Sequence, residues 1–94
     1  MSTSVQPHNQ RPAVVWSSAG EDYDEISQGI SDSIEHCVRR LMPKPGERIL
    51  DLATGTGWTS RVLARRGAKV IGVDIAADLV AAAAVRAKAE GLNI

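Results

Sequence analysis

The 94-residue sequence has a single cysteine, two tryptophans, one tyrosine and no phenylalanine. Because Cys37 has no partner, an internal disulfide is excluded and a reducing compartment fits. No run of about 18 apolar residues occurs, and the first residues lack the apolar segment of a signal peptide. Eleven basic and eleven acidic residues cancel, so the chain has no basic field that would attract nucleic acid. These absences predict a soluble, cytoplasmic protein with no membrane span and no nucleic-acid partner.

The N-terminal quarter predicts a loose arm followed by helix. Residues 1–12 are rich in Ser, Gln, Asn and Pro, which predicts a disordered or extended segment, and we expect a flexible arm over residues 1–20. Residues 22–42 then place apolar side chains three or four apart on one helical face. Gly29 interrupts this face, and Asp32 with Glu35 resembles a capping box. One long helix and two shorter helices remain equally compatible with the pattern.

The rest of the sequence alternates between strands and helices. Residues 47–53 and 69–73 are near-continuous apolar runs, the pattern of parallel strands that are covered on both faces. Residues 57–66 and 76–90 read as helices that end at Gly67 and Gly91. Residues 92–94 resemble the approach to a third strand. We therefore predict an α/β fold in which a parallel sheet has helices on both faces.

Two parallel strands make a poor sheet, because three or more are normally needed for independent stability. Residues 21–94 are therefore expected to be the N-terminal half of a larger domain that stops before its third strand. An unpaired strand edge would also favour self-association. A truncated product or a non-catalytic interaction module remains an alternative.

The turn between the two strands has the features of a nucleotide-type cofactor site. Gly55 and Gly57 allow a ligand to approach the backbone closely, and the following helix offers free N–H groups. Asp74 ends the second strand, where a carboxylate can hold a ribose diol. A dinucleotide fingerprint requires a third glycine where this chain has Ser60, and Asp51 would repel a pyrophosphate. The turn thus suits a ligand with a cationic amino-acid end, while an NAD(P)-dependent oxidoreductase remains the alternative.

Residues 49–57, Ile-Leu-Asp-Leu-Ala-Thr-Gly-Thr-Gly, resemble the first motif of class I S-adenosylmethionine-dependent methyltransferases. The spacing to residues 73–75, Val-Asp-Ile, resembles that of the acidic second motif. The sequence is most similar to the C-methyltransferases of ubiquinone and menaquinone biosynthesis, a methyltransferase type 11 domain. Ala53 departs from the pattern, since the family most often has its first glycine there. The resemblance implies a Rossmann-like fold with S-adenosylmethionine as cofactor and a small-molecule methyl acceptor.

The resemblance also implies roles for individual residues. Asp51 would face the ammonium group of the cofactor, Asp74 would accept both ribose hydroxyls, and Ile75 would press on the adenine. Tyr23, with Trp16, would belong to a lid over the methionine end. The candidate cofactor-binding residues are Asp51, Ala53, Thr54, Gly55, Thr56, Gly57, Asp74, Ile75 and Tyr23. In this family a general base comes from later segments, so no catalytic residue is assigned and the 94 residues alone are expected to be inactive.

Ordinary structural roles compete with some of these assignments. The two glycines could form a tight turn without a ligand. Asp74 could be a solvated strand end, and Asp51 could be a helix-capping or turn acid. His36 and Cys37 are adjacent on a helix, but with no further cysteine and only His8 in the arm, a structural role is favoured over a metal site.

Overall fold

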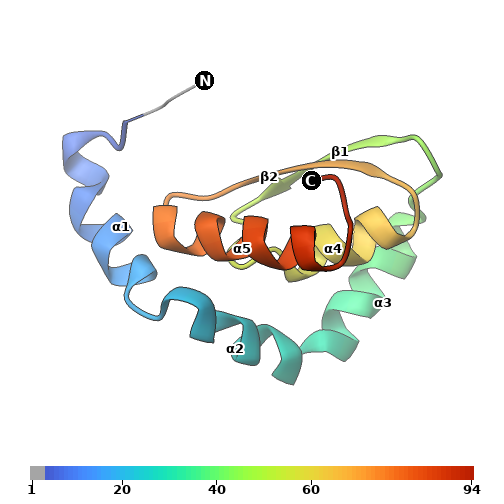
Figure 1. Cartoon of the computed structure of the whole chain (residues 1–94), viewed down its shortest axis with the longest axis horizontal. Helices are drawn as coiled ribbons and strands as arrows, with labels where there is room; N and C mark the ends of the chain where they lie inside the picture. The colour runs from blue at the N-terminus through green and yellow to red at the C-terminus, as the bar shows by residue number, and fades with distance from the viewer. Residues whose placement is uncertain (1–3) are drawn as a thin grey trace.

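The computed structural model describes residues 4–94 and forms a two-stranded parallel sheet packed against helices (Figure 1). The first half of the described chain is helical. Its elements are η1 (Pro7–Asn9), α1 (Gln10–Ser17), η2 (Gly20–Asp22), α2 (Tyr23–Gly29) and α3 (Ser31–Leu41). The second half alternates, with β1 (Arg48–Leu52), α4 (Trp58–Arg65), β2 (Lys69–Val73) and α5 (Ala77–Ala89). The predicted α/β class is confirmed, and the parallel strand pair with its helices forms part of a Rossmann-like arrangement.

Strands β1 and β2 pair in parallel, with Arg48 opposite Lys69 and Leu52 opposite Val73. Side chains alternate between the two faces of a strand, so one face carries Ile49 and Val70. Val70 is buried, and Figure 1 shows α4 and α5 on the same side of the strand pair. The opposite face carries exposed apolar side chains, namely Leu50, Leu52, Ile71 and Val73. Among residues 4–94, helices therefore cover only one face of the strand pair. The sequence predicts that both faces are covered.

The main core lies where α3 and α4 pack against the strands. Its buried members are Val38, Val62, Leu63, Ala68 and Val70. Ile34, Ile49, Trp58 and Ala64 pack against this cluster. The aliphatic composition explains this core, since Trp58 is its only aromatic contributor among the described residues. The core fixes β1 and α4, and thereby the loop between them.

The region between residues 22 and 42 forms two helices, which resolves the alternative that the sequence left open. The helix is interrupted at Ile30, between Gly29 and Ser31. Ile30 occupies the N-cap position of α3 without a side-chain cap. The predicted capping box is absent, because Asp32 lies inside α3 and Glu35 pairs with Arg66 at 3.1 Å. Ile26, Ile30 and Leu41 are more than half exposed, so only Ile34 and Val38 of the predicted apolar face contribute to the core.

The N-terminal segment differs from the predicted arm, of which residues 1–3 lie outside the described part. Residues 10–17 form α1 rather than an extended chain, and α1 contacts α5. Pro12 is compatible with this helix because it lies in the first turn, where a backbone N–H has no intrahelical acceptor. The prediction of a disordered or extended segment, which rested on polar composition, is therefore wrong where it overlaps α1. In residues 4–94, the longest helices are too short or too polar to cross a membrane.

Candidate cofactor-binding site

The loop after β1 turns sharply because three of its residues adopt left-handed backbone conformations. Gly55 and Gly57 have φ angles of 57° and 82°, which glycine adopts at no steric cost. Ala53 has a φ angle of 56°, a conformation that costs a non-glycine residue about 1–2 kcal/mol. The departure from the family pattern at Ala53 thus falls on a position whose backbone favours glycine.

The carboxylate of Asp74 joins the end of β2 to this loop. Its Oδ2 atom accepts the backbone N–H of Gly55 at 2.9 Å, and its Oδ1 atom accepts the N–H of Ala76 at 2.8 Å. The second of these bonds lies just before α5, so Asp74 fixes both the loop and the start of that helix. Each carboxylate oxygen has a second lone pair, which leaves Asp74 able to accept further hydrogen bonds.

A cavity of about 520 Å³ opens beside Gly55 and Asp74. The residues that line it come from α1, α2, the loop after β1, the end of β2, the β2–α5 junction and α5. They are Trp16, Tyr23, Ala53, Gly55, Val73, Asp74, Ile75 and Leu79. Five predicted cofactor residues are therefore brought together, namely Tyr23, Ala53, Gly55, Asp74 and Ile75. The cavity's size is within the range of about 300–1,000 Å³ that is typical of small-molecule and cofactor sites.

The wall of this cavity contains two lining residues that the sequence reading missed. Val73 and Leu79 follow the same apolar patterns as core residues, so no local signal separates them from packing positions. The ring of Tyr23 lies beside the loop, 3.9 Å from the position that a Cβ atom on Gly55 would occupy. The cavity thus combines one carboxylate with apolar and aromatic walls.

Asp51 does not line the cavity, although the resemblance places it at the ammonium group. Its Oδ2 atom accepts hydrogen bonds from the Thr54 hydroxyl at 2.8 Å and from the Ser60 hydroxyl at 2.7 Å. These contacts tie β1 to the loop and to α4. Thr54 likewise lies outside the cavity lining and has a role in holding the loop. Ser60, at the position of the third dinucleotide glycine, is almost fully buried in this hydroxyl–carboxylate cluster.

Gly57 faces α5 instead of the cavity. A Cβ atom at Gly57 would lie 3.0 Å from the Cβ atom of Ala83, closer than ordinary van der Waals contact. Gly57 therefore allows the loop to pack closely against α5. The resemblance instead implies that this residue contacts the cofactor.

Thr56 also points away from the cavity and is only 1% exposed. Its hydroxyl donates to Asp24 Oδ1 at 2.7 Å, and its carbonyl oxygen accepts from Arg61 Nη1 at 2.7 Å. Asp24 and Arg61 were not singled out by the sequence reading. Their pairing spans 37 positions along the chain, and no periodic pattern encodes such a contact.

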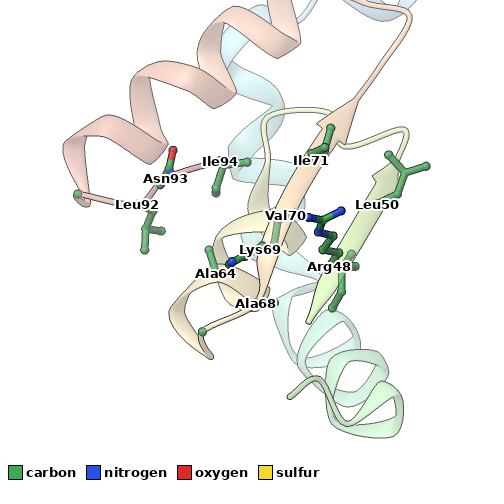
Figure 2. Close-up of a pocket in the computed structure, with 13 residues that line it drawn as sticks. Arg48, Leu50, Ala64, Ala68, Lys69, Val70, Ile71, Leu92, Asn93 and Ile94 are labelled. Atoms are coloured by element: carbon green, nitrogen blue, oxygen red, sulfur yellow. The ribbon is translucent and has the colours of Figure 1, made fainter. Parts of the chain in front are cut away.

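A larger and more open groove of about 940 Å³ lies along β2 (Figure 2). Residues Leu92, Asn93 and Ile94 face this strand across the groove. The groove contains none of the predicted cofactor residues and no carboxylate, so it is not the candidate site. Within residues 4–94, no group of three His, Cys, Asp or Glu side chains is arranged to hold a metal ion.

Comparison with known proteins decides the family of this site. A family model described as "Methyltransferase domain" matches residues 49–94, which include β1, the glycine loop and Asp74. These residues belong to a methyltransferase domain. The resemblance to class I methyltransferases is thereby confirmed.

Two kinds of methyltransferase are similar to this chain. A demethylmenaquinone methyltransferase of Corynebacterium kroppenstedtii is 33% identical over 91 residues, which cover 87% of this chain and 40% of that protein. The 23S rRNA (uracil(1939)-C(5))-methyltransferase RlmD of Acidithiobacillus ferrooxidans is 46% identical over 71 residues, or 74% of this chain and 16% of that protein. RlmD of an Azoarcus species is 47% identical over 60 residues, 64% of this chain and 14% of that protein. The chain thus spans less than half the length of each of these relatives.

These relatives correct the sequence-based prediction of partners. The prediction of a small-molecule acceptor and no nucleic-acid partner is contradicted, because several relatives are named as rRNA methyltransferases. The prediction rested on a net charge of zero over 94 residues. Relatives of this chain include proteins named as rRNA methyltransferases, and the net charge of a segment of 94 residues does not report on the methyl acceptor.

Proposed function

We propose that this chain supplies the S-adenosylmethionine-binding part of a methyltransferase, with residues 21–94 as its cofactor-binding unit. The observation that carries the proposal is the position of Asp74, which lines a 520 Å³ cavity while its carboxylate holds Gly55. A carboxylate at the end of the second strand is the group that binds a ribose diol in Rossmann-like folds. The methyltransferase family match supports the same assignment.

The residues around the cavity fit the cofactor. Each Asp74 oxygen accepts one backbone N–H and retains one lone pair, which provides acceptors for two ribose hydroxyls. Ile75 and Leu79 offer apolar surface suited to an adenine ring. Gly55 keeps the loop wall free of a side chain, and the ring of Tyr23 lies beside it. The lining therefore provides a polar group for the sugar and apolar groups for the base.

When bound, S-adenosylmethionine supplies a methyl group activated by the positive charge of its sulfonium. The chain's own residues contribute binding and orientation, which are the main requirements of an in-line displacement. Trp16 and Tyr23 place aromatic surface along the cavity, where it would shield a bound cofactor from water. No residue of this chain is assigned to proton transfer.

Titration calorimetry on the intact native protein tests the proposal against the dinucleotide alternative. S-adenosylmethionine should bind, and NAD⁺ should not, because Ser60 and its hydrogen bond to Asp51 occupy the position of the third dinucleotide glycine. Binding of NAD⁺ without binding of S-adenosylmethionine would overturn the proposal. Transfer of a labelled methyl group separates an enzyme from a non-catalytic module, and both acceptors named by the relatives, demethylmenaquinone and 23S rRNA, belong in that assay.

A further inference from the structure

A buried ionic cluster lies behind the cofactor cavity and joins four segments of the fold. We call it the Asp24 cluster, and its members are Asp24, Thr56, Arg61 and Arg86. Asp24 Oδ1 accepts from the Thr56 hydroxyl at 2.7 Å and from Arg61 Nη2 at 2.9 Å. Asp24 Oδ2 lies 3.2 Å from Arg86 Nη1. The cluster therefore connects α2, the glycine loop, α4 and α5 through a single carboxylate.

The members of the cluster lie next to cavity residues in sequence but do not line the cavity. Asp24 directly follows Tyr23, and Thr56 directly follows Gly55, and both Tyr23 and Gly55 line the cavity, with the Tyr23 ring lying beside Gly55. Arg61 adds a second attachment by donating from Nη1 to the Thr56 carbonyl oxygen at 2.7 Å. Both the side chain and the backbone of the loop residue are thus fixed with respect to α2.

Stability alone is a weak explanation for this cluster. Asp24 and Arg61 are 7% and 4% exposed, so both charges are largely removed from water. Replacing buried ion pairs with apolar side chains of similar volume is often neutral or stabilising. Charge-assisted hydrogen bonds, in contrast, impose a defined direction and distance on the groups that they join. This cluster therefore provides a fixed geometry between α2 and the loop, which apolar packing would not provide.

We propose that the Asp24 cluster is a positioning device that holds the Tyr23 ring beside Gly55 at the edge of the cavity, and thereby sets the affinity for S-adenosylmethionine. The inference rests on the proposed function. Asp24, Thr56 and Arg61 act through their neighbours and make no contact with the cofactor. The cluster also places α2 within the cofactor-binding unit, although α2 lies outside the residues that match the family model.

Substitutions at Thr56 test the cluster with little change in side-chain shape. Thr56→Val removes the hydroxyl that donates to Asp24 and leaves the Asp24–Arg61 pair in place. Thr56→Ser keeps the hydroxyl and serves as the conservative rescue. In the intact protein we expect Thr56→Val to raise the Kd for S-adenosylmethionine about tenfold, or about 1.4 kcal/mol, and Thr56→Ser to change it less than twofold.

Two further variants complete the comparison. Glu35→Gln is the matched control, because it removes a carboxylate that pairs with Arg66 at an exposed site on α3 and α4, and it should leave the Kd unchanged. Arg86→Gln removes the partly exposed arginine from the cluster and replaces Thr56→Val if that variant does not fold. It should raise the Kd severalfold, since Asp24 loses the ion pair with α5.

Amide hydrogen exchange of α2, measured without cofactor, separates positioning from general stability. We expect faster exchange within Tyr23–Gly29 in Thr56→Val and wild-type rates in Glu35→Gln. A lower melting temperature with an unchanged Kd would overturn the inference, because the cluster would then be structural only. If the wild-type protein does not bind S-adenosylmethionine, the proposed function fails and the positioning role fails with it. If the wild type binds and Thr56→Val binds equally well, the inference alone fails.

Discussion

The carboxylate of Asp74 accepts the backbone N–H of Gly55 at 2.9 Å, across 19 positions of sequence. The same side chain that can hold a ribose therefore also shapes the loop that the cofactor would contact. Asp74 is half-buried at the end of β2, and its other oxygen fixes the N–H of Ala76 before α5. Binding and local folding are consequently coupled at one residue, and substitutions there change both.

Asp74→Ala should weaken S-adenosylmethionine binding and also lower the stability of the protein. Loss of hydrogen bonds to a charged group costs about 1.5–3 kcal/mol, and this carboxylate accepts two from the backbone. We expect a loss of that size both in the free energy of binding, by calorimetry, and in the free energy of unfolding, by urea denaturation. Asp78→Ala is the control, because Asp78 is an exposed acid in the first turn of α5. An Asp74→Ala protein with wild-type affinity would remove Asp74 from the site.

Ala53→Gly should stabilise the protein. Ala53 has a φ angle of 56°, and the left-handed conformation costs a residue with a Cβ atom about 1–2 kcal/mol. Part of the gain is lost because glycine makes the unfolded chain more flexible, so the expected net gain is about 0.5–1 kcal/mol in urea denaturation. Ala81→Gly, at an exposed helical position in α5, should have the opposite sign and cost about 1 kcal/mol. Destabilisation by Ala53→Gly would contradict the strain at this position.

How far the sequence predicts this molecule depends on whether the signal is local. The apolar run after Gly67 predicts β2 to its first and last residue, and the structure places Gly55 and Asp74 at one cavity. Four predicted cofactor residues lie outside the lining of this cavity and hold the loop or its packing, because a motif identifies a turn without stating which way each side chain points. They are Asp51, Thr54, Thr56 and Gly57. The buried pairing of Asp24 with Arg61 has no local signature at all, since charged residues at helical positions ordinarily predict solvent exposure.

Gly57→Ala should destabilise the protein through two separable effects. Its φ angle of 82° costs about 1–2 kcal/mol for alanine, and the new Cβ atom would lie 3.0 Å from the Cβ atom of Ala83. The contact adds about 1–3 kcal/mol, typical of overpacking. Gly46→Ala is a matched control, because Gly46 has the same φ angle of 82° and no neighbouring atom within 4 Å of the added Cβ.

The contact at Gly57 can be isolated with a second substitution. Combining Gly57→Ala with Ala83→Gly removes the steric conflict and leaves the backbone strain and the helix penalty of glycine. We expect a favourable coupling energy of about 1 kcal/mol or more between the two positions. Equal costs for Gly57→Ala and Gly46→Ala, with no coupling to Ala83, would show that the approach between the loop and α5 is not tight.

Arg61→Met should cost far more stability than Arg66→Met, although Arg61 lies within α4, Arg66 directly follows this helix, and both pair with a carboxylate. Arg61 is 4% exposed, and its loss leaves the buried Asp24 with Arg86 and the Thr56 hydroxyl alone. Breaking a buried pair by removing one partner costs about 3–5 kcal/mol. Arg66 and Glu35 form an exposed pair, for which about 0–1 kcal/mol is expected. Urea denaturation of the two variants measures the difference, and equal losses would show that the Asp24 cluster is not desolvated in solution.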